Sequence, residues 1–116
     1  MLPEDRDVAF LWDMRDNAQR LLRIMSGVTR RQFDQDEVVR LAAERLLQNI
    51  GEAARAVSTG FRSQHSEIPW QKIVGQRNIL VHEYGEVKPE LVWQTIAEDL
   101  EELVHLLDPL IPPIDE

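Results

Sequence analysis

The 116-residue sequence contains no cysteine, one tyrosine and only two lysines. Without cysteine the chain has neither a disulfide framework nor a thiolate metal site. No apolar run approaches the roughly 20 residues that a transmembrane helix needs. The first three residues are followed at once by the charged stretch Glu4–Asp7, which does not fit a signal peptide. We therefore expect a cytoplasmic protein with no membrane partner.

Sustained alternation of β-branched and polar residues is also absent, as are Asn-Gly and Asp-Gly hairpin signals. Apolar residues instead recur three and four positions apart, which predicts helices over residues 5–26, 36–58, 69–85 and 89–110. Apolar residues make up 43% of the chain and charged residues 29%, as in ordinary globular proteins. We predict an all-α fold: one domain over residues 1–116, built as an antiparallel bundle of four to five helices.

Several residues are expected to set the helix boundaries. Gly27 is a suitable stop for the first helix. Asp34 or Asp36 can cap the second helix through a side-chain oxygen. Pro69 and Pro89 suit the first turns of the third and fourth helices, where the missing N–H costs nothing.

The segments between the helices are expected to be connections without regular structure. In the first, residues 28–35, Phe33 is the single large apolar side chain and is expected to plug the end of the bundle. The second covers residues 58–68. Gly51 lies in the middle of the second helix at a cost of about 1 kcal/mol relative to alanine. Close approach of another helix would explain its presence.

Negative charge gathers at one end of the chain. Residues 86–116 hold nine acids and one base, a net charge of −8, whereas residues 1–85 hold 12 acids and 12 bases. The acidity therefore does not exclude a nucleic-acid partner for the first 85 residues. Eleven of the 13 bases are arginine, the better bidentate partner for phosphate.

Reactive side chains crowd into residues 75–85, where Arg77, Asn78, His82 and Tyr84 occur within eight positions. A histidine transfers protons near neutral pH. An arginine binds phosphate with two hydrogen bonds and stabilises developing charge, and an amide orients either group. This set suits cleavage of RNA without a metal ion, because the ribose 2′-hydroxyl supplies the nucleophile.

The same residues also have purely structural interpretations. A single histidine near a helix end commonly interacts with the helix dipole, which fits His82. Arg77 could form an ion pair with Glu52 or Glu83. Glu52 is then either a solvated acid or the acid that orients Arg77 in a site. The ring of Tyr84 could simply pack at the helix end.

The other two histidines offer no metal site. His65 lies in a polar segment and is expected to be solvated, and His105 is expected to be a surface or capping residue. With His82 they are too dispersed to bind a metal ion, and no H-x3-H or HExxH spacing occurs. We expect neither a metal nor another cofactor.

The stretch from Gln71 to Tyr84 resembles the HepT-like branch of the HEPN superfamily. It contains the signature R-x4-H-x-Y within Gln-x-Ile-x-Gly-x-Arg-Asn-x-Leu-x-His-x-Tyr. Upstream, Ile50–Ala54 is similar to the family's second-helix motif, and Val92–Leu100 is similar to its last long helix. Gln76 departs from the pattern, since an apolar residue is expected there.

The resemblance implies a HEPN-like bundle that forms a homodimer, with two R-x4-H motifs facing one cleft. It implies a metal-independent endoribonuclease with Arg77 and His82 catalytic and Asn78 in support. It also implies a type VII-like HepT/MntA toxin–antitoxin system, in which a minimal MntA-like nucleotidyltransferase antitoxin transfers AMP to Tyr84. The alternative is a non-catalytic HEPN module that binds a nucleotide or a nucleotidyltransferase partner.

Overall fold

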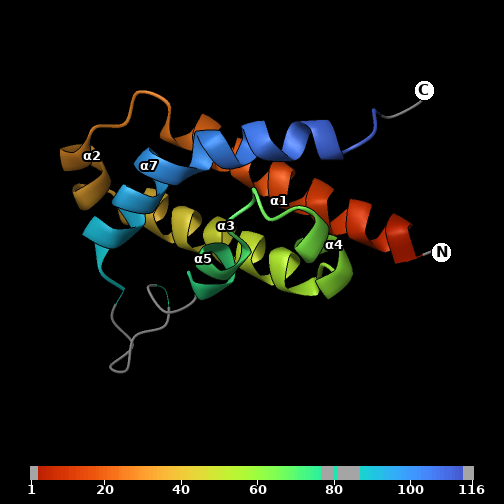
Figure 1. Cartoon of the computed structure of the whole chain (residues 1–116). Coiled ribbons are helices and arrows are strands. Elements are labelled where there is room, and N and C mark those ends of the chain that lie inside the picture. The colour runs from red at the N-terminus through yellow and green to blue at the C-terminus, as the bar shows by residue number, and fades with distance from the viewer. Residues whose placement is uncertain (1–2, 77–79, 81–86, 114–116) are drawn as a thin grey trace.

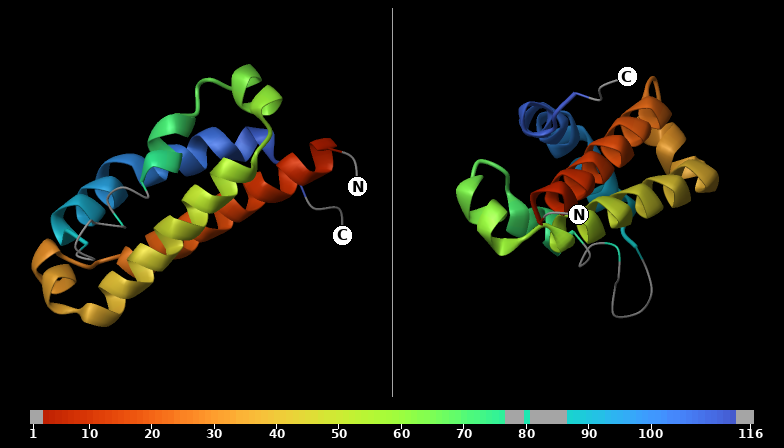
Figure 2. Two further views of the ribbon diagram at one scale, coloured as in Figure 1. Left: turned by 90° about the horizontal axis from the view of Figure 1, so that it is seen from below. Right: turned by 90° about the vertical axis from the view of Figure 1, so that its right-hand side faces the viewer.

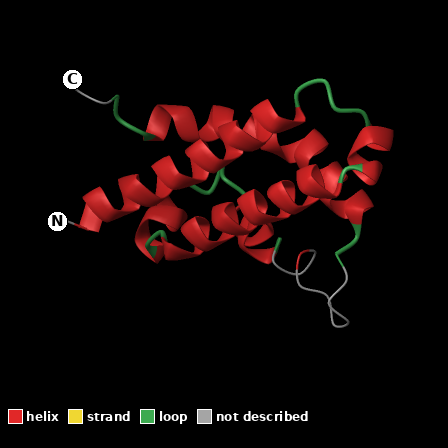
Figure 3. Cartoon of the chain, turned by 180° about the vertical axis from the view of Figure 1, so that it is seen from behind, coloured by secondary structure: helices red, strands yellow, loops and turns green. Residues whose placement is uncertain are grey.

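The computed structural model describes residues 3–76, 80 and 87–113, with side chains from residue 6 onward. Three long helices, α1 (Pro3–Met25), α3 (Glu37–Ala56) and α7 (Pro89–Leu107), account for most of these residues. The shorter elements are α2 (Arg30–Gln35), α4 (Thr59–Gln64), α5 (Trp70–Gly75) and the 3-10 turn η1 (Asp108–Leu110). The described chain contains helices and loops but no strand (Figure 3), which confirms the predicted all-α fold class. None of its helices is long and apolar enough to cross a bilayer.

Helix α1 lies between α3 and α7 and contacts both of them. It runs in the opposite direction to α3 and α7 (Figure 1), as the antiparallel prediction required. An ion pair of 3.1 Å between Arg15 and Asp108 joins α1 to η1. The two ends of the described chain lie at the same end of the bundle.

The core is one cluster of buried apolar side chains that extends from Leu11 to Ile111. In α1 the buried residues Leu11, Met14, Ala18 and Leu21 recur three and four positions apart, the spacing that predicted this helix. In α3 Leu47 is fully buried, whereas its neighbour Leu46 is only partly buried. Helix α3 packs against α1 on one side and α5 on another, so its buried face is wider than one stripe. Helix α7 buries Val92, Ile96, Leu100, Leu103 and Leu107.

Most of the predicted helix boundaries are confirmed. Gly27 follows α1 with φ of 76°, a conformation that glycine adopts at little cost. Asp36 caps α3 by accepting a bond of 3.1 Å from the Val39 N–H, whereas Asp34 pairs with Arg30 instead. Pro89 is the first residue of α7.

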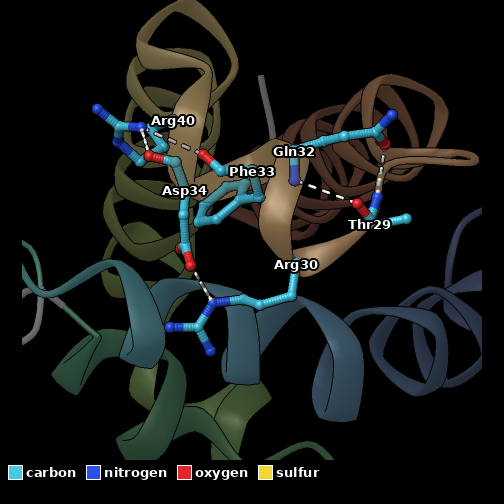
Figure 4. Close-up of polar contacts among 6 residues, drawn as sticks. All are labelled: Thr29, Arg30, Gln32, Phe33, Asp34 and Arg40. Atoms are coloured by element: carbon cyan, nitrogen blue, oxygen red, sulfur yellow. Dashed lines mark hydrogen bonds and ion pairs between the residues drawn. The ribbon is translucent and has the colours of Figure 1, made fainter.

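The connection expected at residues 28–35 contains the short helix α2, which the sequence prediction missed. Its start is fixed by a capping box (Figure 4): Thr29 Oγ1 accepts from the Gln32 N–H at 3.1 Å, and Gln32 Oε1 accepts from the Thr29 N–H at 2.9 Å. The box satisfies two backbone donors that a six-residue helix could not otherwise pair.

Phe33 plugs this end of the bundle, as predicted. Its side chain is fully buried and its ring centroid lies 5.5 Å from that of Trp93 on α7. Arg40 on α3 donates to the carbonyl oxygens of Phe33 and Asp34, which holds α2 against α3 (Figure 4). The aromatic contact and the two backbone bonds together fix the turn between α1 and α3.

The connection expected at residues 58–68 also contains a helix, α4. Ser58 caps it by accepting from the Phe61 N–H at 3.2 Å. The buried carboxylate of Asp7 on α1 in turn accepts from the Ser58 N–H at 2.8 Å and from its hydroxyl at 2.6 Å. This bond pair joins residues 51 positions apart, so the local sequence did not reveal it.

Candidate functional site

Arg77, Asn78, His82 and Tyr84 lie outside the residues that the structure describes. Their predicted proximity and roles therefore stay predictions. The structure describes the elements on either side of them, and also Leu80 in the middle of the motif. These flanking parts show what surrounds the motif.

Helix α5 leads into the motif and is fixed firmly to the bundle. Trp70 and Ile73 are buried, and the Trp70 indole N–H donates to the His65 carbonyl oxygen at 2.9 Å. A Cβ atom placed on Gly51 would lie 3.4 Å from the Ile73 carbonyl oxygen. This confirms the close helix approach expected at Gly51.

The helix that begins at Trp70 is shorter than predicted. It ends at Gly75, and the Gln76 N–H donates to the Ile73 carbonyl oxygen as a C-cap. A single continuous helix from Pro69 is therefore wrong, because it is interrupted at Gln76. Leu80 is again helical, and the rest of the predicted stretch, residues 77–79 and 81–85, lies outside the described residues. Pro69 is the N-cap residue of α5 and not part of its first turn. A bond to the carbonyl three residues back tightens the final turn, which is a common way for a helix to end.

Gln76, the departure from the family pattern, is buried. Its side chain is 8% exposed, and its amide oxygen has no hydrogen-bond partner within the described part of the chain. It lines a cavity of about 240 Å³ between α5 and α7. Apolar residues form much of the wall of this cavity, including Ile50, Ile73, Leu100, Leu103 and Leu106.

A second hollow, of about 260 Å³, lies where α3 faces α5 and Leu80. We call it the α3 hollow; its lining is Leu47, Gln48, Gly51, Glu52, Arg55, Val74 and Leu80. Leu80 lies between Arg77 and His82 in the sequence, so the motif itself supplies part of the wall. The hollow therefore combines an apolar floor with an acid, a base and an amide from α3.

Glu52 lies at this hollow on the exposed side of α3. Its carboxylate accepts a bond of 3.2 Å from the Gln48 amide. Its predicted contact with Arg77 involves a residue outside the described ranges and stays a prediction. Arg55, one turn further along α3, also lines the hollow. The sequence interpretation missed Arg55, although its spacing of three from Glu52 places both on one helix face.

Comparison with known proteins identifies the family. A sequence model of the family "Ribonuclease HepT-like" matches residues 14–110. The chain belongs to the HepT-like ribonuclease family. This match confirms the resemblance inferred from the R-x4-H-x-Y signature and places the fold within the HEPN superfamily.

Several similar proteins carry ribonuclease names. The chain is 35% identical over 96 residues to "Putative RNase MJ1380" of Methanocaldococcus jannaschii, which covers 82% of this chain and 88% of the relative. It is 37% identical over 83 residues to "Putative RNase TTE0752" of Caldanaerobacter subterraneus, covering 72% and 74%. It is 35% identical over 68 residues to "Probable ribonuclease HepT" of Thermococcus cleftensis, covering 59% and 62%. No solved structure matches the chain significantly.

The structure describes the two histidines outside the R-x4-H-x-Y motif, His65 and His105. His65 is half-buried, not solvated as predicted: its ring centroid lies 4.2 Å from that of Phe61, and its Nδ1 lies 3.3 Å from Glu67 Oε1. His105 is exposed on α7, as predicted. Within the described ranges, no three histidine or carboxylate side chains are grouped to hold a metal ion.

One carboxyl group on α3 has an altered pKa. Burial raises the pKa of Glu44, because burial disfavours the charged form, and the positive charge of Arg40 partly offsets this effect. Glu44 lies eight residues before Glu52, about two helical turns away along α3. Glu44 is therefore not among the residues that line the α3 hollow.

Proposed function

We propose that this HepT-like chain is a metal-independent endoribonuclease that acts as the toxin of a type VII-like HepT/MntA toxin–antitoxin system. One observation carries the proposal. The complete Arg77-x4-His82-x-Tyr84 set occurs in a chain that matches the HepT-like family over residues 14–110. The ribonuclease names of the relatives support the activity class.

In the proposed reaction the ribose 2′-oxygen attacks the adjacent phosphorus and the bond to the 5′-oxygen breaks. The products are a 2′,3′-cyclic phosphate and a 5′-hydroxyl end. His82 accepts or delivers the proton, and Arg77 stabilises the charge that develops on the phosphate oxygens. Asn78 supports the two groups, and Glu52 at the wall of the α3 hollow orients Arg77.

This chemistry requires both a proton acceptor and a proton donor, whereas the motif of one chain contains a single histidine. A homodimer with two-fold symmetry brings a second copy of Arg77 and His82 to the same site. The proposed active form is therefore a dimer in which the two motifs face one cleft.

The experiment is an assay of purified protein on total cellular RNA in the presence of excess EDTA. We expect cleavage to persist, because the proposed chemistry uses no metal ion, and we expect fragments that end in 2′,3′-cyclic phosphate. Sequencing of the fragment ends checks both points. Folded, dimeric protein that binds nucleotides but leaves every RNA intact would favour the non-catalytic HEPN module instead.

Regulation is proposed to act on Tyr84, the only tyrosine in the chain. A cognate minimal nucleotidyltransferase would transfer AMP from ATP to the Tyr84 hydroxyl and release pyrophosphate. The added phosphate repels RNA electrostatically, so growth inhibition should be lost. Intact-mass measurement after co-expression with such a partner should show a gain of one or more AMP groups, and Tyr84→Phe should show none. A Tyr84→Phe protein that is still labelled and neutralised would contradict this assignment.

A further inference from the structure

The cavity that Gln76 lines lies between two helices that pack on different neighbours. Helix α5 (green) packs on α3 and α7 (blue) packs on α1, as can be followed in Figure 2. Ile73 and Gln76 line the cavity from α5 and the residue that follows it, and Leu100 and Leu103 line it from α7. We call this space, of about 240 Å³, the α5–α7 cavity. Since each helix is supported by a different neighbour, their own packing does not fill it.

The inner wall of the α5–α7 cavity is apolar. Ile50, Ile73, Leu100 and Leu103 are all at most 6% exposed. An apolar cavity of about 150 Å³ stays free of water and accepts a benzene molecule. The α5–α7 cavity is larger, at about 240 Å³, but smaller than the roughly 300–1,000 Å³ of pockets for drug-sized ligands. A fitting occupant is therefore an apolar body no larger than a two-ring system.

One polar group interrupts this apolar wall. Gln76 is 8% exposed, and its Oε1 accepts no hydrogen bond from the residues that the structure describes. Its backbone N–H donates to the Ile73 carbonyl oxygen at 3.2 Å, which fixes where its side chain starts. A buried acceptor without a partner destabilises the fold, and in native proteins it commonly marks a bound water, ion or ligand. The α5–α7 cavity therefore favours an occupant with an N–H or O–H donor.

The rim of the cavity carries a net negative charge. Lys72 and Asp99 neutralise each other in an ion pair of 3.0 Å. Glu67, whose Oε1 lies 3.3 Å from His65 Nδ1, and Glu102 are the exposed acids of the lining that remain. A negative rim attracts cations and repels phosphates and carboxylates. Nucleotides and other anions are therefore disfavoured in this cavity.

We propose that the α5–α7 cavity binds a small amphiphilic amine whose apolar ring system fills the inner space. A ring N–H donates to Gln76 Oε1, and a positively charged amino group on a short chain faces the carboxylates of Glu67 and Glu102. Arylalkylamines carry this combination of groups. A few placed polar groups in a mostly apolar cavity are the usual features of a small-molecule site. The site is separate from the proposed catalytic residues, and its occupation does not depend on RNA cleavage.

Another hollow against α7 lacks these features. It measures about 400 Å³ and lies between the end of α1 and α7, where Trp93 and Ile96 form part of its wall. The polar residues in its lining, Ser26 and Glu101, are both exposed. Because solvent can pair with both side chains, they do not select a ligand by its hydrogen bonds.

The probe for the first test is tryptamine, which has an indole N–H and a positively charged amino group. Binding is followed by NMR titration of protein with labelled isoleucine and leucine methyl groups, in the absence of RNA. We expect a dissociation constant of about 0.1–1 mM, as is usual for a ligand of this size. The methyl signals of Ile73, Leu103 and Leu106 should shift, whereas those of the exposed residues Ile24 and Leu41 should not.

Two analogues test which groups of the probe are recognised. The benzofuran analogue of tryptamine replaces the ring N–H with an oxygen atom and keeps the size and charge. It should bind at least about tenfold more weakly, because it cannot donate to Gln76 Oε1. Indole-3-acetate keeps the ring N–H but carries a negative charge, so it should not bind measurably below about 10 mM. Equal binding of tryptamine and either analogue would reject the proposed site.

Substitution of Gln76 tests the same hydrogen bond from the side of the protein. Gln76→Met keeps the length of the side chain and removes the acceptor, so tryptamine and its benzofuran analogue should bind within about twofold of each other. Without a ligand, Gln76→Met should melt at a higher temperature than wild type, because it buries no unpaired acceptor. Gln94→Met, exposed on α7, is the control and should keep the wild-type preference for tryptamine.

Substitution of Glu102 tests the charge of the rim. Glu102→Gln should weaken the binding of tryptamine by about two- to fivefold, the range of an exposed ion pair. It should not change the binding of tryptophol, in which a neutral hydroxyl replaces the amino group. Glu98→Gln, exposed on the same helix but outside the cavity lining, is the control. Equal binding of tryptamine by these two variants would contradict the role of the rim.

Three results would overturn the proposed site. The first is the absence of methyl shifts with tryptamine at about 10 mM. The second is a Gln76→Met protein that keeps the wild-type preference for tryptamine over its benzofuran analogue. The third is a Gln76→Met protein that melts below wild type, which would mean that the amide oxygen is already paired in the fold. Protein that binds tryptamine as described but leaves RNA intact would contradict only the proposed function.

Discussion

Replacing His82 with alanine is expected to slow RNA cleavage by about 10²–10⁴-fold, the usual contribution of a positioned general acid or base. Wild-type cleavage should depend on pH near neutrality, because the proposed mechanism moves a proton through His82. This dependence should be absent from the residual activity of His82→Ala. The measurement is single-turnover cleavage of one labelled RNA from pH 5 to 8, with excess EDTA throughout.

Substitutions of Arg77 give a second test of the same proposed site. Arg77→Ala should cost about 10²–10³-fold, as removal of one donor to a developing oxyanion does. Arg77→Lys keeps the charge but loses the two parallel hydrogen bonds to phosphate, so it should recover only part of the rate. An arginine that merely pairs with Glu52 would be replaced by lysine with little loss.

The matched control for these variants is His105→Ala. His105 is exposed on α7 and lies outside the proposed site. It should cleave RNA at the wild-type rate. Circular dichroism and light scattering should show that all four variants are folded and have the wild-type mass. A His82→Ala protein that cleaves as fast as His105→Ala would remove His82 from the proposed mechanism.

The long helices could be predicted because each carries a sustained apolar stripe. In α7 five buried residues from Val92 to Leu107 recur at helical spacing, and Pro89 starts the helix. The short helices could not be found in this way, since six residues hold fewer than two turns. The start of α4 is held by the hydrogen bonds from Ser58 to Asp7 on α1. A contact between residues so far apart leaves no signal in the local sequence pattern.

The sequence predicted which residues form the candidate site, but it did not predict which parts of the fold surround them. Arg77, His82 and Tyr84 could be singled out because they match a family signature. The family match confirms the family, whereas the roles of these residues stay predictions. The α3 hollow could not be foreseen, since it forms where Gly51 and Arg55 on α3 meet Leu80, 25 or more positions away. The end of α5 at Gly75 was missed because the apolar pattern continues through Ile79–Val81.

Replacing Phe33 with alanine is expected to have the largest effect on stability, about 3–5 kcal/mol in the free energy of unfolding. The Phe33 side chain is fully buried and meets Trp93, so its loss leaves a cavity at the junction of α2, α3 and α7. The Thr29 capping box and the bonds from Arg40 hold the backbone of α2 in place, which limits collapse of that cavity. Urea unfolding of wild type and variant at one fixed protein concentration measures the difference.

Two further variants separate loss of packing from loss of α2 itself. Phe33→Leu keeps much of the apolar volume and should recover at least about half of the lost stability. Ile24→Ala removes an apolar side chain that is 38% exposed on α1 and should cost no more than about 1 kcal/mol. Because a dimer is stabilised by protein concentration, unfolding at two concentrations distinguishes weakened association from weakened folding. A Phe33→Ala loss as small as that of Ile24→Ala would mean that α2 is not held by its aromatic contact with α7. The Arg40 bonds would then be what positions this turn.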